Sequence, residues 1–493
     1  MDVLVAQLSS SKPFSVRLLA ATEIRMRLCK SKAPIDELLA AGLLKPLVAL
    51  LSIPSSPGDS TKLQVEATWA LSCITASMHS RHTAAVVDAH AIPVLASMVS
   101  VELPAEVREL SLLCLANIAG ENEQYRDFIL RADFSALHRD GSPSAAKLDI
   151  IVLLRKALAS FSTLVPESFL KTAAHLCCSL TFGTAPLPQF YDVVPLLPIL
   201  QIFVRSRTAA VLEDTLSSVA NLASIDAMRP ILAVFIGRLL ELIEHHDVSV
   251  QKQAVRVLSC LSKGGVIPQL AQPSFLNKVM GLLSKKDVLK QTLELIGAIC
   301  SGPAQLVSSC IAAPGLLAGV LKTLASDDVA IARLGCAVLA SAVRCGSNET
   351  AHTIFFSNSK APALMSLKKV LSRRSFTPAQ VAAIGVLAEL TKPHPATLVS
   401  ESYYEAKRAA QMSDSHFERF GVEAPVKASA ASRKRALERA GFPEVLESVR
   451  DAPESDESVR AAARALLETV WPFISFERAS DSDGEDGSIT LVA

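Results

Sequence analysis

The stretches Glu66-Ala-Thr-Trp-Ala-Leu-Ser-Cys-Ile74 and Leu110-Ser-Leu-Leu-Cys-Leu-Ala-Asn-Ile-Ala-Gly120 decide the fold, because each is one apolar helix of a repeating sequence. A similar helix returns about every 40 to 48 residues. Residues four apart share a helix face, and this relation joins Trp69 to Cys73 and Leu113 to Asn117. Repeats of this length stack side by side, so we expect these faces to form a continuous groove that suits an extended peptide.

The composition favours helices packed on helices. Half of the 493 residues are hydrophobic and only 5% are aromatic, which is typical of helical arrays and not of sheet sandwiches. No Gly-, Pro- or Ser-rich linker divides the chain before about residue 392. The sequence therefore predicts an all-α, right-handed solenoid of about ten repeats over residues 1–475.

Several classes of protein are disfavoured by the sequence. No apolar run reaches the 18 residues of a membrane span, and the start Met1-Asp-Val-Leu4 does not resemble a signal peptide. The ten cysteines form no CxxC pair, so we expect reduced core residues and an intracellular protein. The formal charge of +1 provides no general attraction for nucleic acid or for a membrane, and neither is expected as a partner.

A short turn phrase recurs before apolar helices. It occurs as Ala41-Gly-Leu-Leu-Lys-Pro46, Ala89-His-Ala-Ile-Pro93, Pro314-Gly-Leu-Leu317 and Ala440-Gly-Phe-Pro443. Glycine permits a tight turn between helices, and proline in the first turn of a helix sacrifices no hydrogen bond. We expect the phrase to mark the start of the third helix of each repeat.

Two segments depart from the repeat pattern. Residues 392–432 interrupt it and predict an irregular insertion, followed by a last unit that reaches Trp471. Residues 476–493 are acidic and rich in Ser and Gly, and such a composition predicts a disordered tail.

The repeat phrases resemble those of the importin-α (karyopherin-α) family of armadillo-repeat nuclear import adaptors. The resemblance rests on Ala33-Pro-Ile-Asp-Glu-Leu-Leu39, on Glu66–Ile74, on Ala116-Asn-Ile-Ala-Gly-Glu-Asn122 and on Tyr125-Arg-Asp127. It implies an armadillo solenoid that holds a Lys/Arg-rich nuclear localisation signal of a cargo protein in its concave groove. It also implies a location in the cytoplasm and the nucleus.

The resemblance also implies the groove residues. In the family, Trp and Asn on successive third helices hold the signal: indole faces bind the stems of Lys or Arg, and Asn amides bind the peptide backbone. The matching positions here are Trp69, Asn117, Asn221 and Arg256, with Glu121 as the acidic contact. The ladder is eroded, because Cys73 replaces the Asn partner of Trp69 and Leu113 replaces the Trp partner of Asn117.

In the other units, the same register assigns ladder positions that lack the family residues. These are Ala173 and Cys177, Ser217 beside Asn221, Cys260 beside Arg256, Glu294 and Ala298, and Cys336 and Ala340. An aromatic hot spot at an interface is commonly worth about 2 kcal/mol or more. We therefore expect weaker binding of a basic signal than a complete ladder gives.

The partners follow from the same resemblance. Family members carry a basic amino-terminal segment that binds importin-β, whereas Lys12, Arg17, Arg25, Arg27 and Lys30 lie in a helical pattern and form no basic run. Importin-β is therefore not expected as a partner. The exportin that recycles the family remains a partner that the resemblance implies.

Other interpretations stay open. Trp69 also fits a packing residue, Asn117 a helix-terminal turn, and Glu121 a solvated loop acid. The sequence contains no nucleotide-binding, zinc-protease or hydrolase motif, so neither an enzyme nor a cofactor or metal is expected. The alternative function is a degenerate armadillo scaffold for another protein, which an apolar strip of Leu113, Ala173 and Cys336 would favour.

Overall fold

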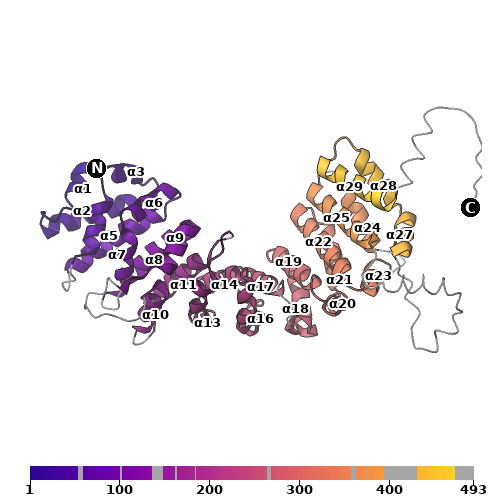
Figure 1. Ribbon diagram of the computed structural model, residues 1–493, viewed down its shortest axis with the longest axis horizontal. Coiled ribbons are helices and arrows are strands. Elements are labelled where there is room, and N and C mark those ends of the chain that lie inside the picture. Colours follow the sequence, from indigo (N-terminus) through magenta and orange to yellow (C-terminus); the bar gives the residue numbers. More distant parts are fainter. Residues whose placement is uncertain are drawn as a thin grey trace, which may run out of the picture. The chain divides into compact units, whose positions relative to one another are not determined.

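The computed structural model describes residues 1–53, 59–99, 103–135, 148–161, 164–183, 185–263, 268–356, 362–373, 375–392 and 430–471. The chain forms two compact units, Met1–Val257 and Leu258–Ala493, and the boundary falls within helix α17. The described residues contain helices and no strands, which confirms the predicted all-α class (Figure 1).

Three-helix units repeat along both parts of the chain. The longest member of each unit is its third helix: α2 (Phe14–Leu28), α5 (Asp59–Thr75), α8 (Ala105–Glu121), α11 (Glu167–Thr181), α14 (Ala209–Leu222), α17 (Val248–Ser262), α19 (Leu289–Cys300), α22 (Val329–Cys345), α25 (Thr377–Thr391) and α29 (Glu457–Val470). The described residues thus hold ten such helices, in agreement with the predicted number of repeats.

Shorter helices precede each third helix. The second helices are α4 (Leu44–Leu51), α7 (Ala91–Ser97), α10 (Ile150–Ala159), α13 (Leu197–Phe203), α16 (Ile236–Leu242), α18 (Pro273–Leu283), α21 (Leu316–Leu324), α24 (Pro362–Leu371) and α28 (Phe442–Asp451). The first helices are α3 (Ile35–Ala40), α6 (Ser80–Asp88), α9 (Glu123–Arg131), α12 (Phe190–Val193), α15 (Arg229–Leu232), α20 (Ala304–Ala312), α23 (Asn348–Phe355) and α27 (Ala430–Arg439). The 3-10 turns are η2 (Val194–Leu196), η3 (Asp226–Met228), η4 (Ala233–Phe235) and η5 (Pro268–Ala271), and α1 (Asp2–Ala6) precedes α2.

The turn phrase marks second helices and not third helices, so that prediction was wrong. Gly42, Gly315 and Gly441 adopt positive φ angles of 77°, 79° and 69° within two residues before the start of α4, α21 and α28. His90 adopts the same left-handed conformation before α7, with φ 56°. A left-handed residue turns the chain sharply, and glycine adopts this conformation without the steric penalty of a side chain. The apolar helix that follows the phrase is short, and the long third helix comes after it.

A buried glutamine fixes the start of the third helix in three units. The Nε2 atom of Gln64 donates to the carbonyl oxygens of Leu51 and Ile53 at 3.2 and 3.0 Å. Gln251 and Gln380 bond in the same way to the end of the preceding second helix, at 2.9 and 2.8 Å. Carbonyls at a helix end lack partners within that helix. These bonds therefore join second and third helices in a constant register.

Two predicted segments lie mostly or wholly outside the described residues. Of the proposed insertion 392–432, only Lys392 and residues 430–432 are described, and none of the tail 476–493 is. Both remain predictions, as do the domain limits. Among the described residues, no single helix is long and apolar enough to span a membrane, and the two helix pairs that reach that size are bent by 115° and 85°.

Candidate peptide-binding surface

The candidate groove residues lie on third helices of several repeats, all within the first compact unit, Met1–Val257. Trp69 is on α5, Asn117 on α8, Asn221 on α14 and Arg256 on α17. The helices α2, α5, α8, α11 and α14 each pack against the next, as Figure 1 also shows. We call the solvent-accessible sides of these five helices the ladder face.

The indole of Trp69 stacks with the guanidinium of an arginine from the neighbouring third helix. The indole is 39% exposed, and the guanidinium of Arg25 from α2 lies 4.6 Å from the ring centroid. Arg25 also forms a short ion pair with Glu66, one turn before Trp69 on α5, and this hydrogen bond raises the pKa of Arg25. Trp69 and Glu66 thus form a slot that accepts a basic side chain by cation–π stacking and charge pairing. Arg25 fills this slot.

Cys73 lies beside another cysteine. Its sulfur is 3.4 Å from the sulfur of Cys29, which lies just past the end of α2. These two cysteines are 44 residues apart, as are Arg25 and Trp69, so each pair joins corresponding positions of consecutive repeats.

Asn117 is half-buried and uses its amide to connect two repeats. Its Nδ2 atom donates to the hydroxyl oxygen of Thr75 at 3.2 Å and to the carbonyl oxygen of Ser72 at 3.5 Å, both near the end of α5. The Asn117 side chain therefore reaches the neighbouring repeat and does not close its own helix as a turn residue.

Glu121 ends α8 and is held by the first helix of its own repeat. Its carboxylate accepts a hydrogen bond of 3.3 Å from the hydroxyl of Thr83, a buried residue of α6. Glu106 and Glu109 are further carboxylates of α8, whereas the sole basic residue of that helix, Arg108, is buried. The ladder face is therefore acidic along α8.

On the next helix, α11, Glu167 pairs with Lys171 at 2.9 Å, and further carboxylates come from α14. Glu213 and Asp214 lie there together with Asn221, which is half-buried. Burial raises the pKa of Asp214, and His175 of α11, 3.8 Å away, opposes this shift. Arg256 is exposed on α17. The sequence prediction included neither Asp214 nor His175, because neither occupies a Trp or Asn position.

The comparisons with known proteins agree in fold and family. No protein-family model matches the chain. "Importin subunit alpha-1b" of Oryza sativa subsp. japonica is 28% identical over 58% of this chain and 51% of its own length. "Importin subunit alpha-2" of Arabidopsis thaliana is 28% identical over 47% of this chain and 39% of its own length. The chain is a divergent importin-α-like armadillo protein. The match with the first of these relatives spans about half of the relative's length.

A solved structure supports the solenoid. The crystal structure of an engineered protein matches 95% of this importin-α-like chain and 98% of its own, with a TM-score of 0.68 and 20% identity. At this identity the match concerns the fold alone.

The structure corrects the ladder register of the importin-α-like protein in three units. Ala173, Cys177, Ala298 and Cys336 are buried and cannot contact a ligand on the ladder positions. The accessible residues lie one or two positions away, namely Lys171 and His175 on α11, and Ala337 and Ser341 on α22. The apolar strip that would favour the alternative scaffold does not form, since Leu113 is accessible but Ala173 and Cys336 are buried.

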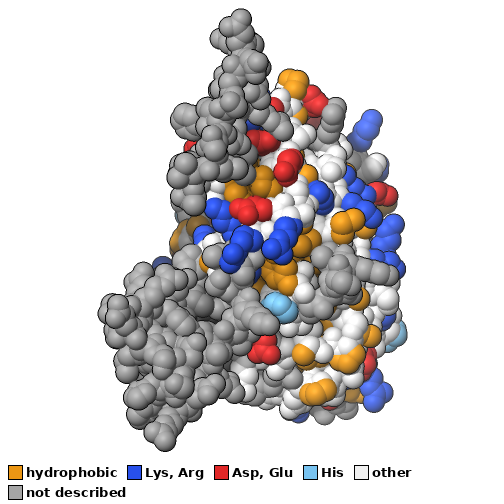
Figure 2. Space-filling model, turned by 90° about the vertical axis from the view of Figure 1, so that its right-hand side faces the viewer, with side chains coloured by type: hydrophobic (Ala, Val, Ile, Leu, Met, Phe, Trp, Pro, Cys, Tyr) orange, Lys and Arg blue, Asp and Glu red, His pale blue; other side chains and the backbone are white. Residues whose placement is uncertain are grey.

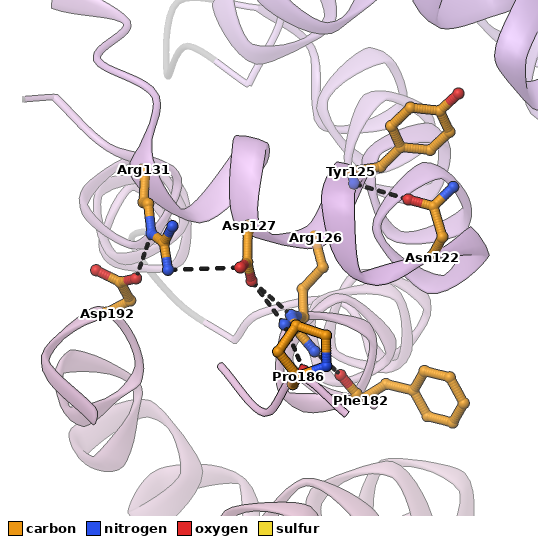
Figure 3. A network of polar contacts seen from close by, with 8 residues as sticks. All are labelled: Asn122, Tyr125, Arg126, Asp127, Arg131, Phe182, Pro186 and Asp192. Carbon is orange, nitrogen blue, oxygen red and sulfur yellow. Dashed lines mark hydrogen bonds and ion pairs between the residues drawn. The ribbon is translucent and has the colours of Figure 1, made fainter. Parts of the chain in front are cut away.

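One residue of the family phrase has a structural role. Arg126 is 1% exposed, and its guanidinium donates to the carbonyl oxygens of Phe182 and Pro186 at 2.6 and 3.0 Å and pairs with Asp127 (Figure 3). Asp127 also contacts Arg131, which pairs with Asp192 at 2.7 Å. The network fixes the segment after α11 against α9. It leaves Arg126 with no access to a ligand.

A second candidate surface lies within the second unit of the importin-α-like chain. A hollow of about 760 Å³ opens between α25, α27 and α29. Its lining consists mainly of small apolar residues: Val381, Gly385 and Ala388 of α25, and Ala462, Ala465 and Val470 of α29. Lys392 and Lys434 also contribute to it. The hollow suits an apolar segment better than a basic one.

Figure 2 shows basic, acidic and hydrophobic side chains interspersed on one face of the molecule, in keeping with the formal charge of +1. Within the part of the chain that the structure describes, no group of three or more His, Cys, Asp or Glu side chains is placed to hold a metal ion.

Proposed function

We propose that this chain is a protein-binding adaptor in nuclear protein import and that its ladder face binds a Lys/Arg-rich segment of a cargo protein. The proposal concerns binding and not catalysis, and a location in the cytoplasm and the nucleus belongs to it. Two of the proteins that the chain resembles are named importin subunit alpha, and this supports the proposal.

The slot around Trp69 is the observation that carries the proposal. A guanidinium already stacks on the indole and pairs with Glu66, so the slot has the chemistry that a basic peptide side chain needs. A Lys or Arg of the cargo would displace Arg25 and take the same position.

The charge of the neighbouring helices fits the same ligand. Glu106, Glu109 and Glu121 on α8 and Glu213 and Asp214 on α14 are acidic, and neither helix has an exposed basic residue. Side chains of an extended peptide alternate in direction, so alternate Lys or Arg residues would face these carboxylates. The amide nitrogen of Asn117 already bonds to α5, so its oxygen, together with the side chain of Asn221, would bond the peptide backbone in this proposal.

A fluorescence titration with a labelled Lys/Arg-rich peptide tests the proposal. We expect saturable binding that Trp69→Ala weakens by about 2 kcal/mol, or about 30-fold in Kd. Phe128→Ala is the matched control. Phe128 is a 53% exposed aromatic residue of α9, in another repeat of the same compact unit, Met1–Val257. Absence of binding, or equal loss in both variants, rejects the cargo claim.

The hollow in the second unit favours one other function, an armadillo scaffold that binds an apolar helix of another protein. Small residues such as Gly385 and Ala465 allow close approach of a partner helix. Ala465→Arg would fill the hollow and block such a partner, while leaving binding of basic peptides to the first unit unchanged. An apolar helical peptide that binds equally well to this variant would reject the scaffold function at this site.

A further inference from the structure

Cys29 and Cys73 form an accessible pair of thiols on the ladder face. Their sulfur atoms are 3.4 Å apart, across the packed helices α2 and α5. Cys29 is exposed and Cys73 is half-buried. Reagents in solution can therefore reach this pair through Cys29.

This pair differs from the other cysteines of the chain. Cys300 and Cys310 also interact, but both are fully buried. Cys114, Cys177 and Cys336 are buried too. Among the ten cysteines, Cys29 alone is exposed, and it has a second thiol within contact distance.

We propose that Cys29 and Cys73 are a dithiol modification site that a small disulfide, such as glutathione disulfide, oxidises to an intramolecular disulfide between α2 and α5. The sulfur of Cys29 attacks one sulfur of the oxidant, losing its proton and releasing one glutathione thiol. The sulfur of Cys73 then attacks the mixed disulfide at Cys29, loses its proton and releases the second glutathione thiol. The two cysteines are oxidised, and one glutathione disulfide is reduced to two glutathione molecules.

The surroundings set the order of these steps. Cys29 is the accessible sulfur and follows the last turn of α2, so it meets the oxidant first. Burial raises the pKa of Cys73 to about 12, which keeps this thiol protonated near neutral pH and unsuited to the first attack. Closure requires the sulfurs to approach from 3.4 Å to the bond length of about 2.0 Å. Rotation of the Cys29 side chain at the helix end can supply this movement.

The disulfide would lie one helical turn from the Trp69 slot. Cys29 follows Arg25 by four residues, and Cys73 follows Trp69 by four. Oxidation would thus tie α2 to α5 beside the stacked pair and fix the spacing of the two helices at the slot. We expect this fixed spacing to change how readily a ligand displaces Arg25. The effect on peptide binding rests on the proposed function, whereas formation of the disulfide does not.

Intact mass spectrometry of the full chain tests the site. We expect incubation in a buffer of oxidised and reduced glutathione to remove two hydrogen masses, reversibly, and a non-reduced digest to contain the peptide linking Cys29 to Cys73. Cys73→Ser should stop at a stable glutathione adduct on Cys29. Cys345→Ser, another half-buried cysteine, should behave like the unchanged chain.

The outcomes separate this proposal from the proposed function. A persistent glutathione adduct on Cys29 of the unchanged chain, or a linkage that omits Cys73, overturns the dithiol site without the use of any variant. A disulfide that forms in a protein that binds no basic peptide upholds the site and rejects only its role in cargo binding. Trp69 emission in a Trp471→Phe background gives a second readout, because the chain has two tryptophans. We expect it to change on oxidation, and to stay constant in Cys29→Ser, which lacks the accessible thiol that reacts first.

Discussion

Arg25→Ala is expected to strengthen the binding of basic peptides, because Arg25 competes with the ligand for the slot at Trp69. Its guanidinium stacks 4.6 Å from the indole centroid and pairs with Glu66. The side chains of Arg25 and Glu66 are 19% and 17% exposed, so solvent reaches both partners and the pair has only modest strength.

The magnitude follows from these two contacts. A cation–π contact at an accessible site is worth about 0.5–1 kcal/mol, and an accessible ion pair adds about 0.2–1 kcal/mol. Arg25 therefore holds the slot with about 1–2 kcal/mol, which a ligand must overcome. Removal of Arg25 should lower the Kd of a Lys/Arg-rich peptide by about 5- to 30-fold.

Fluorescence anisotropy with a labelled basic peptide measures this change. Arg27→Ala is the control, since Arg27 pairs with Glu23 inside α2 and loses a similar charge without touching Trp69. The gain from Arg25→Ala should disappear in a Trp69→Ala background, because the slot is then absent. Equal affinities of the Arg25→Ala and Arg27→Ala variants would refute competition in the slot. Weaker binding by Arg25→Ala would instead make Arg25 a ligand contact.

Two further predictions concern stability. Arg126→Ala should lower the free energy of unfolding by about 2–3 kcal/mol in urea titrations, because it removes the bonds from a buried guanidinium to the carbonyls of Phe182 and Pro186 and to Asp127. Replacement of the 49% exposed Arg131 by alanine should cost about 1 kcal/mol or less. Similar losses in the two variants would contradict this role of Arg126. Asp214→Asn should raise the thermal midpoint at pH 7, because burial raises the pKa of Asp214 above 3.8 and the ionised form is penalised in the folded state. The gain in thermal midpoint should shrink as the pH falls through this raised pKa, because wild-type Asp214 then takes up a proton. A lower thermal midpoint of Asp214→Asn at pH 7 would contradict the raised pKa of Asp214.

The repeat architecture could be predicted from local sequence, because each unit contains a 3.6-residue apolar period and a turn. Gly42 and Gly441 marked real turns, but the sequence did not reveal which of the two following helices was the long one. Helix length depends on packing against neighbouring repeats, which the phrase itself does not encode.

The candidate site was predictable only where the family phrase was strong. Trp69 and Asn117 lie on accessible sides of third helices, as expected, whereas Ala173 and Cys336 proved to be buried. A shift of one or two residues rotates a helical position by about 100–200°, so weak repeats cannot fix the register.

Arg25 escaped prediction because it is one of several scattered basic residues. Its significance depends on the spacing of 44 residues to Trp69, which becomes visible once α2 and α5 pack side by side. The buried Gln64, Gln251 and Gln380 offer a register signal that sequence reasoning missed. Gln64 and Gln251 precede the ladder positions of their own repeats, Trp69 and Arg256, by five residues.

The central claim is that the ladder face of the first unit binds an extended basic peptide, and a crystal structure of the complex tests it most directly. We expect continuous density for a peptide along α5 and α8, with a Lys or Arg side chain over Trp69 in the place of Arg25. Density for the peptide in the hollow between α25 and α29, with Arg25 still stacked on Trp69, would contradict the claim.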